Sequence, residues 1–537
     1  MNSFKNNKQF NEIINLIKSK NIIAAKKKIE NLIQLEPDNF IYLDIYGLIL
    51  NEEGKYFEAS KVLERAIAIN NSKAETYNNL SISYKNLGKN KKAIDILHKA
   101  LKLKSNMYSS NINLAINHIE LNDFENAIKY LHQSIKIRPR SKNLYLKLSE
   151  IYFKLGKIDE AISSLRSILS FIPEDAQTYN HLFTLEWQND NHINVINEII
   201  LILKNQNIPD FELLKILLNS SKIPEVLIKS TKCIDEIIKS HPLNKDYLSV
   251  KAKLSESTYN FDEAYGIYKK LSKLPEHKID YIKMIFFAKS RKKSLSQINQ
   301  HIEDLSKEEI ESINLVDIND AISLKLHILK SLNNENYNNF VNYNKHLYQK
   351  EIETPVGWKD IKTFNRELGQ DLIKFHNKNK APIDRAVNNG SHTIGNLLEE
   401  NKEIKSFNTL RLILDKHMHN YILSNPNISN RLNNQEHKGL NLIGSWSVSL
   451  NKKGFLASHI HPTAFLSSAY YVKIPEKQDE KKAGYIHFGQ PTPNIFKLQP
   501  DLFIKPKEGL LLIFPSYYWH GTVPYDDNRV SISADYK

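Results

Sequence analysis

Residues 74–107 read AETYNNLSISYKNLGKNKKAIDILHKALKLKSNM, and this 34-residue unit decides the fold of the amino-terminal part because it recurs along the chain. Its large apolar, small and turn-forming positions are Tyr77, Leu80, Ser81, Tyr84, Gly88, Ala93, Leu97 and Ala100. The corresponding positions 34 residues later are Asn111, Leu114, Ala115, His118, Asn122, Ala127, Leu131 and Ser134. Apolar residues three and four apart make one face of a helix, and small residues let a second helix approach closely. The unit therefore predicts two packed helices with a turn at Gly88.

The period and the residue types of this unit resemble the tetratricopeptide repeat (TPR). Clear copies occupy residues 6–39, 40–73, 74–107, 108–141 and 142–175, and weaker copies follow at 176–209 and around Tyr247 to Pro275. We therefore expect a helical array over residues 1–300, clear in 6–175 and degenerate in 176–300. The resemblance implies a superhelix whose concave face binds a protein or peptide partner. The alternative is a structural spacer or an oligomerisation module.

Glycine and proline indicate a change of composition near residues 351–358. The first 350 residues contain 12 of them, whereas the last 187 contain 22, so helix-compatible sequence gives way to turn-rich sequence. We expect capping helices and a linker over residues 301–355, and a separate domain over 356–537. Short apolar runs bounded by turn residues predict strands at 442–450, 455–461, 465–473, 484–488, 510–514, 520–523 and 529–535, with a turn at 451–454.

One of these predicted strands contains two histidines, in the sequence Ser458-His459-Ile460-His461-Pro462. Side chains two apart on a strand point to the same face, so His459 and His461 can present two imidazoles to one point. A third histidine, His520, lies on a later predicted strand. Histidine ligands with open coordination positions suit a non-haem Fe(II) site, and the guanidinium of Arg529, nine residues beyond His520, suits the carboxylate of a co-substrate.

The motifs in the last third of the chain resemble the 2-oxoglutarate/Fe(II) dioxygenase superfamily, of the prolyl-hydroxylase-like type. The closest resemblance is to an oxygenase family with the order His-x-His-Pro, His and Arg-x-Ser. The matching residues are Trp446, Gly454, His459 to Pro462, Leu466 to Val472, Pro506 to Gly509, Phe514 to Ser516, His520 and Arg529 to Ser531. The resemblance implies that His459, His461 and His520 hold the metal. It also implies that Arg529 and Ser531 bind a carboxylate of 2-oxoglutarate, to which Tyr471 adds its hydroxyl.

The predicted fold class is therefore multidomain, with an all-α TPR superhelix followed by a double-stranded β-helix, or jelly roll, braced by helices. The implied function is that of a 2-oxoglutarate- and Fe(II)-dependent dioxygenase that hydroxylates a protein or peptide substrate recruited by the array. The implied cofactors are Fe(II), 2-oxoglutarate as co-substrate and O2, with ascorbate as a further candidate. No side chain beyond the metal site is expected to act as a catalytic acid or base.

His461 stands where the superfamily usually has an aspartate or glutamate. Three neutral imidazoles leave the iron with one more net positive charge than a ligand set that includes a carboxylate. His461 is therefore either a direct ligand or a group behind the ligands. Two other functions stay open: a TPR adaptor with a catalytically silent jelly roll, and a three-histidine cupin-type dioxygenase that does not use 2-oxoglutarate. Arg529 argues against the cupin alternative.

The net charge of +14 is spread along the chain. Basic minus acidic residues give 50 − 41 = +9 up to residue 350 and 24 − 19 = +5 afterwards, and no basic stripe stands out, so we expect no nucleic-acid partner. No apolar run approaches the roughly 18 residues of a membrane span, and the first residues do not resemble a signal peptide. The single cysteine, Cys233, excludes an intramolecular disulfide. These features predict a cytoplasmic protein with no membrane partner.

Overall fold

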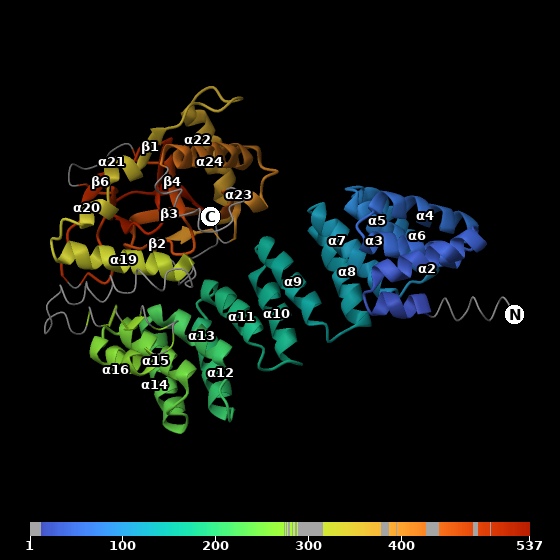
Figure 1. Cartoon of the computed structure of the whole chain (residues 1–537), viewed down its shortest axis with the longest axis horizontal. Coiled ribbons are helices and arrows are strands. Elements are labelled where there is room, and N and C mark those ends of the chain that lie inside the picture. The colour runs from blue at the N-terminus through green and yellow to red at the C-terminus, as the bar shows by residue number, and fades with distance from the viewer. Residues whose placement is uncertain are drawn as a thin grey trace. The chain divides into compact units, whose positions relative to one another are not determined.

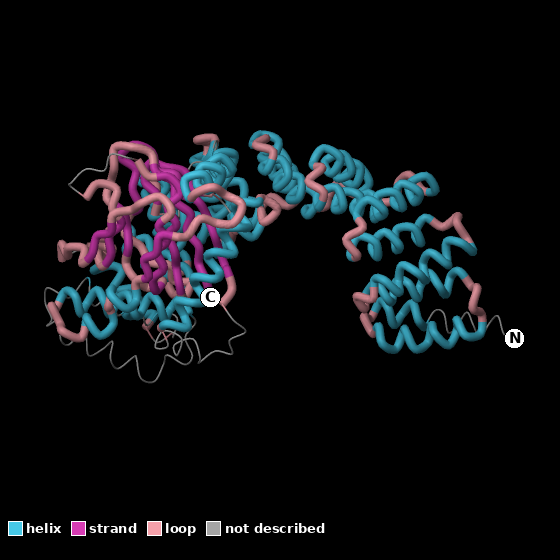
Figure 2. The backbone as a smooth tube through the Cα atoms, turned by 90° about the horizontal axis from the view of Figure 1, so that it is seen from above, coloured by secondary structure: helices cyan, strands magenta, loops and turns pink. Residues whose placement is uncertain are grey.

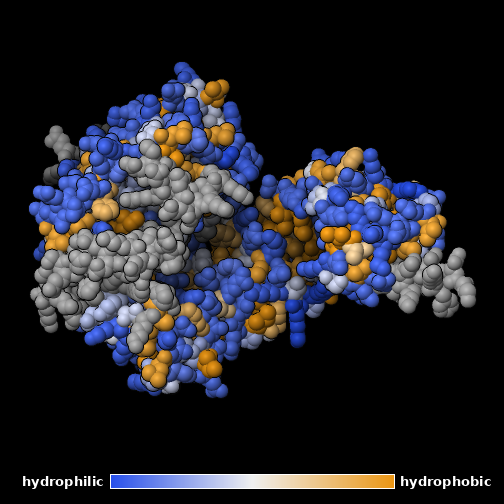
Figure 3. All heavy atoms as spheres, in the orientation of Figure 1, coloured by the Kyte–Doolittle hydropathy of each residue, from blue (hydrophilic) through white to orange (hydrophobic). Residues whose placement is uncertain are grey.

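The structure is a computed structural model of the chain. It describes residues 12–272, parts of 274–287, 315–376, 386–393, 395–425, 440–475, 482–494 and 496–537. The chain forms two compact units, Met1–Leu185 and Glu186–Lys537 (Figure 1). Hydrophilic side chains cover most of the visible face of each unit, and smaller apolar patches lie among these side chains (Figure 3). None of the described helices combines the length and the apolar character that a membrane span requires.

The described part of the first unit consists of helices and short connections (Figure 2). Its helices include α2 (Ile22–Leu35), α3 (Phe40–Glu52), α4 (Tyr56–Ile69), α5 (Ala74–Asn86), α6 (Asn90–Leu103), α7 (Tyr108–Glu120), α8 (Phe124–Ile137), α9 (Lys142–Lys154) and α10 (Ile158–Leu169). The helices pack in pairs, α3 on α4, α5 on α6, α7 on α8 and α9 on α10. Each of these pairs lies within one of the predicted 34-residue repeats.

Two features of the first unit follow the 34-residue period and explain it physically. The alanine at the twentieth position of each clear repeat is fully buried, so the second helix lies close to its neighbours. These residues are Ala25, Ala59, Ala93, Ala127 and Ala161. The turn between the two helices has a positive φ, which favours glycine. The positive-φ positions are Lys20, Gly54, Gly88, Asn122, Gly156 and Asp190. The turn at Asp190 continues the period into the weaker repeat 176–209, although glycine is lost there.

Further helices precede the sheets of the second unit. They are α12 (His192–Asn205), α13 (Phe211–Asn219), α14 (Pro224–Ser240), α15 (Lys245–Ser257), α16 (Phe261–Leu271) and α19 (Leu315–Ser331), while α11 (Ala176–Gln188) spans the division between the units. Leu324 and Ile328 of α19 share an apolar cluster with Ala252 of α15 and Tyr268 of α16. Residues 301–314 of the expected capping segment lie outside the described residues, and the domain limits at 300 and 355 stay predictions.

Two antiparallel sheets form the carboxyl-terminal part, as a jelly roll requires. The strands are β1 (Tyr348–Glu351), β2 (Val387–His392), β3 (Leu442–Leu456), β4 (Leu466–Lys473), β5 (Ile486–Phe488), β6 (Leu502–Ile504), β7 (Leu510–Pro515), β8 (His520–Thr522) and β9 (Arg529–Tyr536). The larger sheet has the order β1-β7-β4-β9-β3-β2, and the smaller has the order β6-β5-β8. The predicted fold class, helical repeats followed by a jelly roll with bracing helices, is confirmed.

Alternation along the strands of the larger sheet separates a face packed on helices from a face packed on the smaller sheet. Tyr470 and Ile532 lie in a cluster with α22 (Ile361–His376) and α24 (Lys405–Ser424). Tyr471, on the opposite face, clusters with Phe488 of the smaller sheet. The shorter helices are η1 (Ser220–Lys222), α20 (Tyr337–Phe340), α21 (Tyr343–His346) and α23 (Leu397–Glu400). The candidate site residues lie on the face that packs on the smaller sheet.

The predicted turn at 451–454 is wrong, because β3 runs through these residues as one strand. Gly390 of β2 pairs with Leu450 and Asn388 pairs with Phe455, so the residues between them on β3 form a long bulge. A bulge bends its strand, and the backbone N–H of Leu456 beyond it donates to the Thr522 hydroxyl of β8. The bulge therefore carries the chain from the larger sheet to the smaller one, immediately before the His-x-His sequence.

Candidate metal centre

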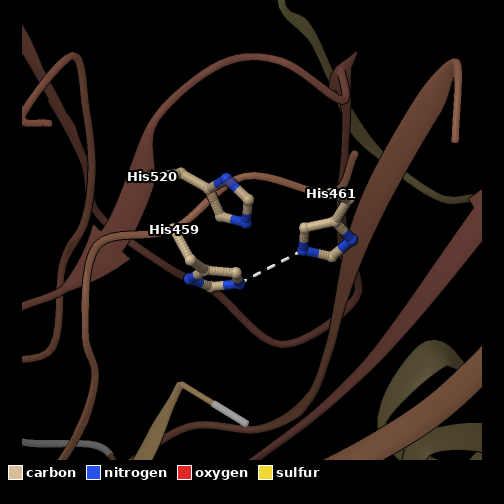
Figure 4. Close-up of side chains that lie close together, drawn as sticks. All are labelled: His459, His461 and His520. Atoms are coloured by element: carbon tan, nitrogen blue, oxygen red, sulfur yellow. Dashed lines mark hydrogen bonds between the residues drawn. The ribbon is translucent and has the colours of Figure 1, made fainter. Parts of the chain in front are cut away.

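Three histidine side chains gather beside the smaller sheet, as predicted (Figure 4). His520 begins β8, and His459 forms an antiparallel bridge with it, in which each backbone N–H donates to the other's carbonyl oxygen at 2.9 and 3.0 Å. The backbone N–H of His461 donates to the carbonyl of Ser516 at 2.9 Å. Backbone bonds thus hold all three positions, and one ring nitrogen of each histidine lies within 4.8 Å of the others.

Each ring is oriented by a hydrogen bond at its Nδ1 atom. The acceptor is the Ala457 carbonyl for His459, at 2.8 Å, and the Tyr518 carbonyl for His520, at 2.9 Å. For His461 it is Oδ1 of Asp535, at 2.7 Å. Carbonyl and carboxylate oxygens only accept, so each Nδ1 carries a proton, and in a neutral ring the Nε2 atom then keeps its lone pair. Metal-binding histidines commonly have this arrangement, with the outer nitrogen donating to an oxygen.

The Nε2 atoms of His459 and His461 lie 3.1 Å apart (Figure 4, dashed line). If both rings are neutral and donate through Nδ1, two lone pairs face each other here, an arrangement that a cation between them would stabilise. Two nitrogens on one metal ion, at bond lengths of about 2.0–2.1 Å and at tetrahedral or octahedral angles, are separated by about 2.8–3.4 Å. The histidines therefore fit a divalent transition-metal ion, for which imidazole is a suitable ligand.

Asp535 is a site residue that the sequence reasoning missed. Its Oδ1 atom accepts from His461 Nδ1 and from the Ser467 hydroxyl, both at 2.7 Å, and its side chain is only 8% exposed. Asp535 pairs with Ser467 across β9 and β4. The one available signal in the sequence was the alternation of β9, which places Asp535 on the same face as Arg529 and Ser531. The contact with His461, however, joins segments 74 residues apart.

Aromatic side chains surround the three imidazoles. Trp446 of β3 stacks on His461 with ring centroids 5.4 Å apart, and Phe514 of β7 lies 4.7 Å from the ring of His520. Burial, reinforced by the neighbouring imidazoles, lowers the pKa of His520 well below its ordinary value. His520 is therefore neutral near pH 7, which is the protonation state that a metal ligand needs.

The predicted carboxylate-binding residues lie farther along the same strands. Arg529 is 5% exposed, and its guanidinium donates to the Gly484 carbonyl at 2.7 Å. Ser531 pairs with Tyr471 across β9 and β4. Burial raises the pKa of Tyr471 to about 12, although the positive charge of Arg529 acts in the opposite direction. Within the described residues no carboxylate forms an ion pair with Arg529, so this buried cation lacks a counter-charge.

Two small residues lie on the strand face between the histidine cluster and the residues around Arg529. Ala469 and Ser533 pair with each other, midway between the Ser467–Asp535 pair and the Tyr471–Ser531 pair. Both are partly exposed, whereas the residues of the two flanking pairs are buried. Because both side chains are small and partly exposed, solvent reaches the strand face at this point, between the histidines and Arg529.

Helix α19 contacts both segments that carry the histidines. The buried side chain of Asn319 donates to the carbonyls of Pro462 and Ala464, at 2.7 and 2.8 Å, just beyond His461. The Trp519 indole N–H, next to His520, donates to the Ser323 carbonyl at 3.4 Å. The metal-site loops are thus held by a helix whose other contacts include the repeat-type helices α15 and α16.

Comparisons with known families agree with this geometry. Residues 444–535 match the family described as "Putative 2OG-Fe(II) oxygenase". Residues 47–88, 74–107 and 118–182 match tetratricopeptide repeat families. The chain thus combines tetratricopeptide repeats with a carboxyl-terminal domain that matches this 2OG-Fe(II) oxygenase family. No curated protein matches.

Several solved structures are similar to part of the chain. The crystal structure of MamA is 20% identical, with 30% of this chain and 95% of that chain covered and a TM-score of 0.28. PilW, a type IV pilus biogenesis factor, is 17% identical, with 39% and 97% covered and a TM-score of 0.32. A thermophilic TPR protein of Thermus thermophilus is 17% identical, with 34% and 98% covered and a TM-score of 0.29.

Proposed function

We propose that this protein is a 2-oxoglutarate- and Fe(II)-dependent dioxygenase that hydroxylates a protein or peptide substrate. The observation that carries the proposal is that a histidine cluster and a buried guanidinium lie in one barrel. Three imidazoles come together at one end of a strand face, and at the other end lies the Arg529 guanidinium, which pairs with no carboxylate among the described residues. The histidine cluster suits a divalent cation, and the guanidinium suits a carboxylate.

His459, His461 and His520 would hold the iron through Nε2, because their Nδ1 atoms are engaged elsewhere. Bound iron would supply the oxidation of a C–H bond by O2, coupled to decarboxylation of 2-oxoglutarate to succinate and carbon dioxide. The protein binds, orients and excludes water. Trp446 and Phe514 supply apolar walls around the imidazoles. No side chain is required to act as an acid or base.

Arg529 would bind the carboxylate of 2-oxoglutarate farther from the iron, with hydroxyls from Ser531 and Tyr471 beside it. A guanidinium has five N–H donors, and the Gly484 carbonyl takes one, so a planar fork is available for two parallel bonds. Tyr471 lies four positions beyond Ser467 on β4, which is about 13 Å of extended strand. The small residues Ala469 and Ser533 lie within this length, where the carbon chain of a five-carbon dicarboxylate would lie.

The repeat array would recruit the substrate, since TPR families are protein-interaction modules. Attachment of a segment to the repeats raises its effective concentration at a site in the same chain, so a weakly bound residue can still be hydroxylated efficiently. This role favours a protein or peptide substrate over a free small molecule.

Anaerobic titration of the full-length protein with Fe(II) and 2-oxoglutarate tests the proposal. We expect the weak visible charge-transfer band of the iron chelate, and succinate formation after O2 is admitted. His520→Ala should abolish both signals, whereas His417→Ala is the matched control, because that histidine lies on α24 and bonds the Tyr348 hydroxyl.

The two other functions give different results in this titration. A silent adaptor would bind the metal or nothing, and would form no succinate under any condition. A three-histidine enzyme that does not use 2-oxoglutarate would bind Fe(II) without the charge-transfer band, and would be indifferent to Arg529→Gln. Either result would refute the proposed reaction.

A further inference from the structure

The three histidines include no carboxylate ligand, but a carboxylate, that of Asp535, is hydrogen-bonded to one of them, His461. Asp535 Oδ1 bonds His461 Nδ1, on the side of the ring away from the Nε2 atom that faces His459. Asp535 is therefore not a ligand in this geometry, because its carboxylate bonds Nδ1 of His461 while Nε2 of the same ring faces the other histidines. Trp446 stacks on one face of the same ring and limits its tilt.

The charges of the site give Asp535 a further role. Among the described residues that face this space, Arg529 and Asp535 carry the two buried charges, and these sum to zero. They lie six residues apart on β9, about 20 Å along an extended strand, so they do not pair directly. Fe(II) and 2-oxoglutarate also sum to zero. The formal charges of the buried space therefore sum to zero both without and with its two ligands, although Arg529 and Asp535 do not pair, whereas without Asp535 the loaded site would have a net charge of one positive unit.

We propose that Asp535 is a positioning residue that supplies, through His461, the negative charge which a directly bound carboxylate supplies in related sites. The inference rests on the proposed metal centre. The carboxylate fixes the Nδ1–H tautomer of His461, aims its Nε2 atom and increases electron donation from the ring to the metal. Ser467 holds the same carboxylate oxygen in place through its hydroxyl.

The test uses Co(II) as the metal probe on the full-length chain, with visible absorption as the readout and thermal melting of the metal-free protein as a fold control. Asp535→Asn keeps the size and an oxygen that accepts from His461 but removes the charge. We expect Co(II) to bind about 10- to 100-fold more weakly and its ligand-field bands to shift. Asp415→Asn is the matched control, because Asp415 accepts from the hydroxyl of Tyr536, the next residue on β9. Its Co(II) affinity should stay within twofold of wild type.

Two further variants separate charge from folding. Asp535→Glu, which retains the carboxylate, should recover part of the affinity, and Ser467→Ala, which leaves the charge in place, should cost less than Asp535→Asn. Unchanged Co(II) affinity and spectrum in Asp535→Asn would overturn the inference. It would also be overturned if Ser467→Ala lost as much affinity as Asp535→Asn, because hydrogen-bonded packing alone would then account for both. Failure of the wild-type protein to bind Co(II) is a distinct result, which refutes the metal centre itself.

Discussion

Replacing Arg529 by glutamine should have opposite effects on ligand binding and on the stability of the metal-free protein. The guanidinium is buried, bonds the Gly484 carbonyl and has no acidic partner among the described residues. Burying a cation without a counter-charge is costly, so its removal should leave the melting temperature of the metal-free protein unchanged or higher. The same guanidinium should be the main anchor for 2-oxoglutarate.

The magnitude follows from the two bonds that the guanidinium fork can form. Each hydrogen bond to a charged group contributes about 1.5–3 kcal/mol. Opposite charges about 4 Å apart attract by about 4 kcal/mol at an effective dielectric constant of about 20. These two figures describe the same contact and are not summed, so we expect a loss of about 3–4 kcal/mol, or a roughly 100- to 1,000-fold weaker Kd.

The assay is anaerobic titration of Fe(II)-loaded protein with 2-oxoglutarate, followed by the charge-transfer band. Arg529→Lys keeps the charge but loses the fork, so its Kd should lie between those of the wild type and Arg529→Gln. Arg411→Gln is the control, because Arg411 pairs with Asp415 on α24 and should not influence binding. A Kd for Arg529→Gln within threefold of wild type, in a protein that still binds Fe(II), would refute the assignment.

Three further outcomes are expected. Asn319→Asp replaces the two N–H donors that bond the Pro462 and Ala464 carbonyls with acceptors. It should therefore lower the free energy of unfolding by about 2–3 kcal/mol and weaken Co(II) binding. The control, Asn339→Asp at an exposed position, should change neither quantity. Ala469→Leu should place a larger side chain over the strand face and weaken 2-oxoglutarate binding at least tenfold in the same titration; an equal loss of Co(II) affinity would instead indicate general damage to the fold. Burial lowers the pKa of His327 to about 3, from about 6.5 in an unfolded chain, so its contribution to stability is complete above pH 6.5 and decreases as the pH falls from there toward 3. Denaturant unfolding should therefore show about 2 kcal/mol less stability at pH 5 than at pH 7 from this group, at about 1.4 kcal/mol per pH unit, and His327→Phe should remove that part of the pH dependence.

Much of the fold could be predicted because its signals are local and periodic. The buried alanines and the positive-φ turns recur every 34 residues, so each repeat contains the signals that predict its own two helices. Strands β4 and β9 were placed to within about two residues, because alternation and turn residues mark them. The strand predicted at 455–461 is wrong, because β3 ends at Leu456 and His459 forms only an isolated bridge with His520. The strands β1, β2 and β6 were missed, because they are short and their pairing partners, not their own composition, hold them in the sheets.

The turn predicted at residues 451–454 failed for a related reason. Lysine, asparagine and glycine together favour a reversal, but pairing with β2 on both sides of these residues makes them a bulge within one strand instead. That bulge has a consequence for the site, since it redirects the chain toward β8, where His459 meets His520.

The sequence by itself determined which residues could bind a metal and a carboxylate, because those properties belong to the side chains and to the two-residue repeat of a strand. Only the tertiary structure decided which groups form hydrogen bonds with these residues and hold them in place. Asp535 reaches His461, Asn319 reaches the loop after it and Gly484 accepts from Arg529, and each contact joins residues that are far apart in the chain. Such contacts arise from the register of the sheets and from the packing of α19 on the barrel, which no local pattern encodes.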